Sequence, residues 1–165
     1  MIDVINFLMV YFFVCSSDPS VVIYMGKDKY ENEELIKYAW HDVDIWFHVA
    51  NLSSAHVYLR LPKPISSYAE IPDAIVQECA QLTKANSIEG CKKNSCHINY
   101  TWARNLKKTI GMEVGAVTFH NNKDVQTILL EKDKEIIKRI MKTKVEQMPD
   151  LNKMLEEHKE AVRAE

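Results

Sequence analysis

Two predicted strands place aromatic and basic side chains on a shared face. Side chains of a strand alternate between the two faces of a sheet. In the predicted strands 44–49 and 55–61, one face carries only apolar side chains and is expected to be core. The opposite face carries the flat rings and cations that an unstacked base and its phosphate require. These candidate nucleic-acid-binding residues are Trp46, His48, His56, Tyr58 and Arg60.

A helix packed on this face would give the same side chains a structural role. Trp46 and Tyr58 would then be ordinary core residues, and the histidines would be hydrogen-bonded inside the protein. Asp44 shares the face but fits poorly as a phosphate contact. We expect it to orient His48 or a backbone amide.

A second candidate surface comes from an uneven distribution of charge. Residues 84–108 contain six basic residues and one acid, with Tyr100 and Trp102 interleaved among them. A patch of this size could hold a few phosphates, and a solvated surface is the alternative. Together with Lys27, the predicted phosphate contacts are Lys92, Lys93, Arg104, Lys107 and Lys108.

Other residues that could bind a metal or act in catalysis do not have the spacing that such sites need. Cys91, Cys96 and His97 do not have the spacing of a zinc knuckle, so we expect reduced thiols, no metal and no cofactor. His48 and His56 could form an acid–base pair, but nothing places a nucleophile beside them. The sequence has no glycine-rich phosphate loop and no GxSxG elbow. We therefore expect a protein that is not an enzyme.

The elements that must position these residues are those of a soluble α+β domain. The 165 residues are 47% hydrophobic and 27% charged, which excludes a disordered chain, a collagen and a polytopic membrane protein. The net charge of −2 means that any affinity for nucleic acid requires a local basic patch. The pattern predicts a single domain with a mostly antiparallel sheet packed against helices, followed by a long C-terminal helix.

Apolar periodicity and turn residues locate the individual elements. A hairpin is expected around the turn Asn121-Asn122-Lys123, and a helical pattern begins at Asp133 and is interrupted at Pro149. Residues 131–165 carry balanced charge over a broken apolar stripe, typical of a coiled coil or of a helix lying on its own domain. Strands are predicted at 10–14, 21–25, 44–49, 55–61, 97–101, 116–120 and 125–130, and the other helices at 32–40 and 72–90.

The first fourteen residues are nearly all apolar. They lack the basic residues of a signal peptide and the length of a transmembrane helix, and residues 10–14 favour a buried strand. We therefore expect a cytoplasmic protein, with membrane association or secretion through this stretch as the alternative.

Several motifs taken together resemble the NFACT-R family. The resemblance extends from about Met9 to Asp150. This family is the RNA-binding domain of the ribosome quality-control proteins that recruit tRNA to stalled large subunits. The matching segments are Tyr24-Met25-Gly26-Lys27 with Asn32 and Leu35, Asp44-Ile45-Trp46-Phe47-His48, Ser53-Ser54-Ala55-His56-Val57, Leu106-Lys107-Lys108 and Gly115-Ala116-Val117.

The resemblance implies a nucleic-acid-binding module without catalytic activity. We expect RNA, as tRNA or ribosomal RNA, to be the ligand, and DNA is the alternative because nothing in the sequence reads a 2′-hydroxyl. A protein partner, or self-association, through the C-terminal helix is a further alternative. The expected division is an extension at 1–8, an NFACT-R-like domain at 9–130 and a C-terminal helical or coiled-coil segment at 131–165.

Overall fold

A seven-stranded antiparallel sheet runs through the protein. The computed structural model describes residues 8–165. The strand order is β8-β5-β3-β4-β2-β1-β9, and each strand is antiparallel to its neighbours. The strands are β1 (Val10–Val14), β2 (Val22–Gly26), β3 (Asp44–Val49), β4 (Val57–Arg60), β5 (Ser95–Trp102), β8 (Gln126–Glu131) and β9 (Val145–Gln147).

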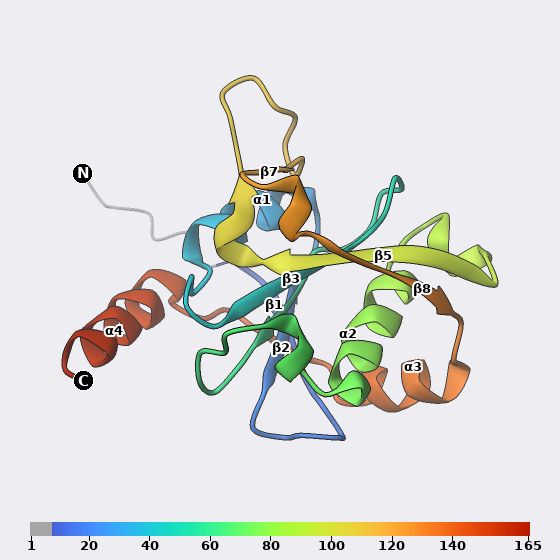
Figure 1. The fold of residues 1–165 in the computed structure, drawn as a ribbon, viewed down its shortest axis with the longest axis horizontal. Helices are drawn as coiled ribbons and strands as arrows, with labels where there is room; N and C mark the ends of the chain where they lie inside the picture. Colours follow the sequence, from blue (N-terminus) through green and yellow to red (C-terminus); the bar gives the residue numbers. More distant parts are fainter. Residues whose placement is uncertain (1–7) are drawn as a thin grey trace.

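Helices cover both faces of this sheet. Figure 1 shows α2 and α3 side by side on one face, and α1 with a small second sheet, β6 and β7, on the other. The helices are α1 (Lys29–Tyr38), α2 (Asp73–Ala85), α3 (Lys134–Met141) and α4 (Leu151–Arg163), with β6 at Leu106–Lys107 and β7 at Thr118–Phe119. Short 3₁₀ turns lie at Tyr68–Glu70 (η1), Gly90–Lys92 (η2), Ala103–Asn105 (η3) and Asn122–Asp124 (η4). The predicted α+β class is confirmed.

The alternation of side chains along the strands produces two separate cores. Ile45 and Leu59 belong to the larger core, which α2 and α3 cover. Trp46 and Tyr58 point the other way, into a smaller core that includes Leu35 of α1. The prediction of an apolar face on β3 and β4 is confirmed. The opposite face is covered as well, which is the alternative that the sequence left open.

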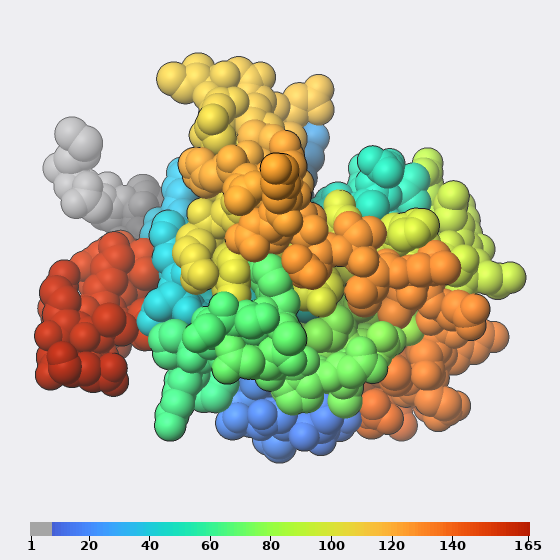
Figure 2. Space-filling view, in the orientation of Figure 1, coloured from blue at the N-terminus to red at the C-terminus, as the bar shows by residue number. Residues whose placement is uncertain are grey.

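Two segments protrude from this body. Residues 108–117, here called the arm, connect β6 to β7 and stand above the sheet in Figures 1 and 2. Helix α4 projects to the left in both views. Gly111 and Gly115 in the arm have φ values of +91° and +84°, a region that glycine occupies without strain.

The expected hairpin around residues 121–123 does not form. β7 pairs instead with β6, and β8 pairs with β5. The reason is the turn η4, where Asn121 Oδ1 accepts from the amide of Lys123 and the Asn121 carbonyl accepts from Asn105 Nδ2 at 3.0 Å. These bonds redirect the chain between β7 and β8, so the two strands join different sheets.

The C-terminal region also differs from the single interrupted helix that the pattern predicts. Helix α3 ends at Met141, β9 then pairs with β1, and α4 begins at Leu151 after Pro149. Ile140 of α3 is fully buried in the larger core. Helix α3 and β9 thus pack with the elements that precede residue 130, and α4 follows them as the last helix.

At the other end of the chain, β1 occupies the apolar residues 10–14 as expected. Leu8 packs against the smaller core, and the rest of the predicted extension lies outside the described residues. Among residues 8–165, no helix combines the length and the apolar character needed to cross a membrane.

A buried carboxylate ties the β1–β2 turn to α2. Glu78 is 1% exposed and accepts from the Cys15 thiol at 2.9 Å. It also accepts from the amide and hydroxyl of Ser16 and of Ser17, at 2.7–3.3 Å. Burial alone would raise the pKa of this carboxyl, but the hydrogen bonds lower it to about 2. The folded protein therefore stabilises the ionised form of the Glu78 carboxyl.

We expect Glu78→Gln to lower the free energy of unfolding by about 1–3 kcal/mol at pH 7, because the amide replaces an ionised acceptor that several buried donors use. The folded pKa lies below the usual value of 4.5, so this stabilisation is complete above pH 4.5 and is lost as the pH falls toward 2. Urea unfolding at several pH values measures the difference between the variant and the parent. The control is Glu89→Gln, at an exposed position. An equal loss in both variants would contradict the role of Glu78.

Candidate nucleic-acid interface

Arg60, a predicted phosphate contact, forms a buried ion pair and is not free. Its Nε and Nη2 each lie 2.8 Å from an oxygen of Asp44, and its guanidinium lies 3.6 Å from the centre of the Trp40 ring. Asp44 also accepts from Tyr24 Oη at 2.6 Å and from the backbone amide of Trp40 at 2.8 Å. Burial alone would lower the pKa of Arg60, but Tyr24 and Asp44 raise it. Asp44 therefore orients a backbone amide, which is one of the two expected roles, and it holds Arg60 rather than His48.

Trp46 and Tyr58 are core residues, so the prediction that they lie open to stack on a base is wrong for this structure. Trp46 is 2% exposed and Tyr58 is fully buried. The Tyr58 ring stacks on Tyr24 at 4.8 Å, and Trp46 meets Phe119 of β7 edge-on at 5.6 Å. The physical reason is that α1 and the small sheet cover this face, which alternation alone does not reveal.

His56 is also buried, and it is neutral. Its Nδ1 accepts a hydrogen bond from Trp46 Nε1 at 3.0 Å. Burial, helped by the neighbouring His48 and Lys108, lowers the pKa of His56 to about 3. A neutral, buried imidazole cannot serve as a cation for a phosphate, nor as the acid of an acid–base pair near neutral pH.

His48 alone of this face is half-exposed. Its ring stacks on Trp46 at 5.3 Å, and its Nδ1 lies 2.6 Å from the carbonyl of Val49. Burial lowers the pKa of His48 despite that backbone contact, so the ring is more often neutral than an exposed histidine. Its open side is therefore a flat polar surface backed by an aromatic ring, which suits stacking better than charge pairing.

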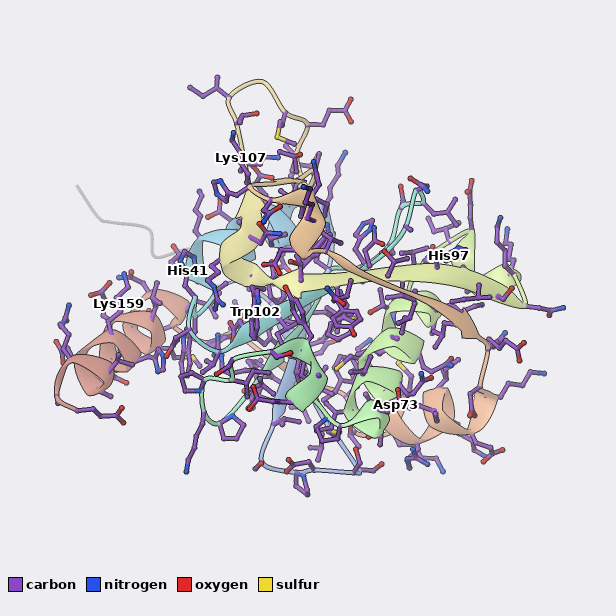
Figure 3. All side chains as sticks on the ribbon, viewed as in Figure 1. His41, Asp73, His97, Trp102, Lys107 and Lys159 are labelled. Atoms are coloured by element: carbon purple, nitrogen blue, oxygen red, sulfur yellow. The ribbon has the colours of Figure 1, made fainter. Side chains whose placement is uncertain are left out.

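The predicted basic patch is divided between the two ends of β5. Lys92 and Lys93 precede this eight-residue strand, whereas Arg104 and Lys107 follow it, so about 25 Å separates them. Figure 3 shows His97 and Trp102 at opposite ends of the strand, with Lys107 beyond Trp102. The four side chains are exposed, but they do not form one compact surface.

Three of the cations in the basic segment have structural partners. Lys84 is buried and donates to the carbonyls of Gly90 and Lys93. Arg104 donates to the carbonyl of His41 at 3.0 Å. Lys108 lies 2.8 Å from a carboxylate oxygen of Glu33 and donates to carbonyls of the arm. Lys108 therefore anchors the arm to α1 and is not an open phosphate contact.

Two adjacent clefts lie beside the start of α1. The first cleft, of about 880 Å³, is bounded by residues 29–32, residues 51–56 with His48, and residues 113–116 of the arm. The second cleft, of about 570 Å³, is bounded by residues 25–29 and 53–55, with Lys144 at its edge. The two share Lys29, Asn32, Ser53 and Ser54. A ligand in one cleft would thus continue into the other across the same side chains.

Unpaired lysines surround these clefts. Lys27, Lys29 and Lys144 are exposed, and no ion pair to them occurs within residues 8–165. The ammonium group of Lys144 lies 3.9 Å over the Tyr11 ring. The result is positive charge on both sides of the shared wall.

The acids beside these lysines are engaged by internal bonds. Asp28 Oδ1 accepts from the amides of Tyr30 and Glu31 and so caps α1. Glu31 accepts from the backbone amides of Met9 and Lys27, at 3.0 and 2.8 Å. Glu33 pairs with Lys108. Two exposed acids still oppose an anionic ligand, Glu113 on the wall of the first cleft and Asp28 on that of the second.

The sequence motifs locate most of this site. The segments Tyr24–Lys27, Asn32 and Ser53–His56, far apart along the chain, converge on the two clefts. Lys29 and Lys144 were not predicted. Lys29 is adjacent to a motif and could have been included on its charge. Lys144 reaches the site only because β9 pairs with β1, and no local pattern indicates that pairing.

The remaining sequence candidates do not join the site. Cys91 donates to the carbonyl of Ile88, and Cys96 is buried. Within the described part of the chain, no three residues of the metal-binding types come together as a possible metal site. Helix α4 rests on the domain through His158, which lies 2.8 Å from Asp42 and stacks on Trp40. Its use as a partner helix stays a prediction.

Comparisons with known proteins agree with the motifs. The family model of the NFACT protein RNA binding domain matches residues 9–121. Coiled-coil domain-containing protein 25 of Mus musculus is 54% identical over 146 residues, covering 87% of this chain and 69% of that protein. The Rqc2 homolog RqcH of Streptococcus pneumoniae is 27% identical over 111 residues, covering 67% of this chain and 19% of that protein.

A solved structure shares the fold. The C-terminal part of the fibronectin/fibrinogen-binding protein from Streptococcus suis has a TM-score of 0.63 and 22% sequence identity. The match covers 78% of this chain and 48% of that one. At this level of identity the likeness shows a common architecture.

We expect the His56 imidazole to remain neutral at pH 5, because its pKa is about 3 in the folded protein. The bond from Trp46 to Nδ1 places the proton on Nε2. Nitrogen-15 NMR of the imidazole reports both its charge and its tautomer. The same protein in denaturant is the control, where the usual value near 6.5 applies. A protonated His56 at pH 5 in the folded protein would show that the buried bond to Trp46 is absent.

Proposed function

The chain belongs to the family of NFACT protein RNA-binding domains, and from this membership we propose that it is a non-enzymatic module that binds unpaired RNA across the two clefts. Lys27, Lys29 and Lys144 contact phosphates, and the open side of His48 supports a base or sugar. Four buried side chains act indirectly, by stabilising the part of the sheet that borders the clefts. They are Trp46, His56, Tyr58 and Arg60.

The observation that carries this proposal is the placement of unpaired lysines around clefts formed by the family motifs. Binding of nucleic acid depends first on neutralising phosphates, and exposed lysines without ion pairs are suited to it. Each cleft also falls in the size range of about 300–1,000 Å³ that is usual for small-ligand sites. Such a cleft accepts a nucleotide that projects from a single strand or loop, not a duplex.

The similarity to Rqc2 homolog RqcH supports a ligand in the translation apparatus. We propose tRNA or ribosomal RNA as that ligand, ribosome quality control as the process, and the cytoplasm as the location. A large structured RNA would also reach the cations at the two ends of β5. Lys92, Lys93, Arg104 and Lys107 then steer the backbone of such an RNA without forming part of the clefts.

We propose a non-enzymatic role because of the protonation and contacts of two histidines, His48 and His56. His56 is buried and neutral, and His48 Nδ1 faces the carbonyl of Val49. No serine or cysteine is hydrogen-bonded to either ring among the described residues. The site therefore supports binding rather than cleavage of a phosphodiester.

The variant Lys27→Glu/Lys29→Glu/Lys144→Glu should lose at least about tenfold in affinity for a single-stranded RNA. The slope of log affinity against log salt should fall by about 2, because each phosphate contact on a single strand contributes about 0.7. Fluorescence anisotropy at several salt concentrations measures both quantities. The matched control is Lys63→Glu/Lys134→Glu/Lys138→Glu, at exposed positions away from the clefts. Equal losses in the two triple variants would overturn the placement of the site.

The variant Lys92→Glu/Lys93→Glu tests whether the clefts bind a short RNA independently of the cations outside them. It should bind a short single-stranded RNA as the parent does, because neither lysine lines either cleft. It should bind an intact tRNA several-fold more weakly and with a smaller salt dependence. The same loss for both RNAs would place Lys92 and Lys93 in the primary site.

A further inference from the structure

A strip of the sheet beside the first cleft is left open. Trp46 packs against the small second sheet, but His48, the next side chain on the same face of β3, is half-exposed. The strand register continues this row from His48 to Asn99 of β5 and Thr127 of β8. Adjacent strands lie about 4.8 Å apart, so the row extends the surface by about 10 Å beyond His48. Asn99 is half-exposed and Thr127 is exposed, so this part of the face is not covered as Trp46 is.

A groove of about 460 Å³ runs along this strip. One wall is the loop 50–52, which is fixed to β5 because the amide of Ala50 donates to the carbonyl of His97 at 2.9 Å (Figure 1). The other wall consists of side chains between Lys93 and Asn99, together with Thr127. Residues 51 and 52 line both this groove and the first cleft. The groove therefore begins where the first cleft ends.

The charge in this groove has one sign. Lys93 is exposed, and within the described part of the chain it has no ion pair and no acidic side chain lines the groove. The acid nearest in register is Glu131, which lies opposite Ser95 and outside the lining. The remaining polar groups are amides, hydroxyls and the exposed imidazole of His97. This composition favours a ligand that combines phosphates with hydrogen-bond acceptors.

Asn99 presents hydrogen-bond donors that are already oriented. Thr127 Oγ1 donates to Asn99 Oδ1 at 2.7 Å, which fixes the carboxamide and leaves both protons of Nδ2 free. Among residues 8–165 this Nδ2 has no partner, and it is open to solvent rather than buried. Donors of this kind pair with the carbonyl and ring-nitrogen acceptors on the edges of unpaired bases. Because Thr127 holds the amide, the donors need no rearrangement when a base arrives.

We infer that the groove is a further subsite of the interface, where Asn99 donates to a base of the RNA strand that leaves the first cleft. The inference rests on the RNA binding proposed above. His97, exposed beside Asn99, offers a ring on which a base stacks, and Lys93 contacts a phosphate at the far end of the groove. A short strand fills the clefts alone, whereas a longer strand also occupies the groove. The subsite thus makes affinity depend on the length of the unpaired strand.

Asn99→Asp tests the subsite without changing the size of the side chain. The carboxylate still accepts from Thr127, but it removes both donors and repels phosphates. The probes are single-stranded RNAs of about 4 and about 12 nucleotides, which span the usual range of single-strand sites. The matched control is Asn122→Asp, the same substitution at an exposed position outside the groove.

Asn99→Asp should bind the longer RNA at least about fivefold more weakly than the parent, and the shorter RNA within about twofold of it. The control variant should match the parent with both probes. Equal losses for the two lengths, or equal losses in the two variants, would overturn the inference. His97→Ala, at an exposed position, repeats the test if Asn99→Asp does not fold, and it should also weaken only the longer RNA.

A measurement on the unmodified protein keeps the test independent of the variants. The side-chain amide resonances of Asn99 should shift when the longer RNA is added and stay in place when the shorter RNA is added at the same occupancy. Unchanged resonances with the longer RNA would overturn the inference, as would an equal shift with polyglutamate, which carries charge but no bases. Failure of the proposed function is distinct, because the parent would then bind neither RNA.

Discussion

The buried ion pair between Arg60 and Asp44 is the interaction on which the second face of the sheet depends. Two charges are taken from water there, and the cost is offset by their mutual attraction and by the hydrogen bonds that Asp44 accepts. Asp44 receives two bonds from Arg60, one from Tyr24 and one from the chain at Trp40. Removal of either charge would leave the other buried and unpaired, at a cost of about 3–5 kcal/mol. The pair therefore fixes β2, β3 and β4 to the segment that follows α1.

Under the proposed function, this constraint places the binding surface at the margin of the sheet and not at its centre. With Arg60 engaged and Trp46 and Tyr58 packed beneath α1, the face offers no open ring. The face remains open at two places, the start of α1 and the loop 50–55. The two clefts lie between these segments. The aromatic and basic residues of β3 and β4 thus support the proposed interface from beneath and do not form its surface.

The sequence predicts which residues share a face far better than what covers that face. Alternation separates Ile45 from Trp46 correctly, because the two cores are local consequences of a pleated strand. Whether Trp46 faces water depends on α1 and on Phe119 of β7, which come from other parts of the chain. The position of Lys144 and the partner strand of β8 were not predicted for the same reason, since both follow from pairings between distant segments.

The motif residues consequently fall into two physical groups that a loss of binding alone does not separate. Trp46 and His56 act through the bond that fixes the end of the loop 50–56, and Gly26 acts by admitting α1 close to β2. Under the proposed function, changing any of them should move a wall of a cleft and lower binding and stability together. Lys27 and Lys29 line a cleft with exposed side chains, and under the proposed function their substitution lowers affinity with the fold intact. Parallel measurement of unfolding is what assigns a residue of this family to one group or the other.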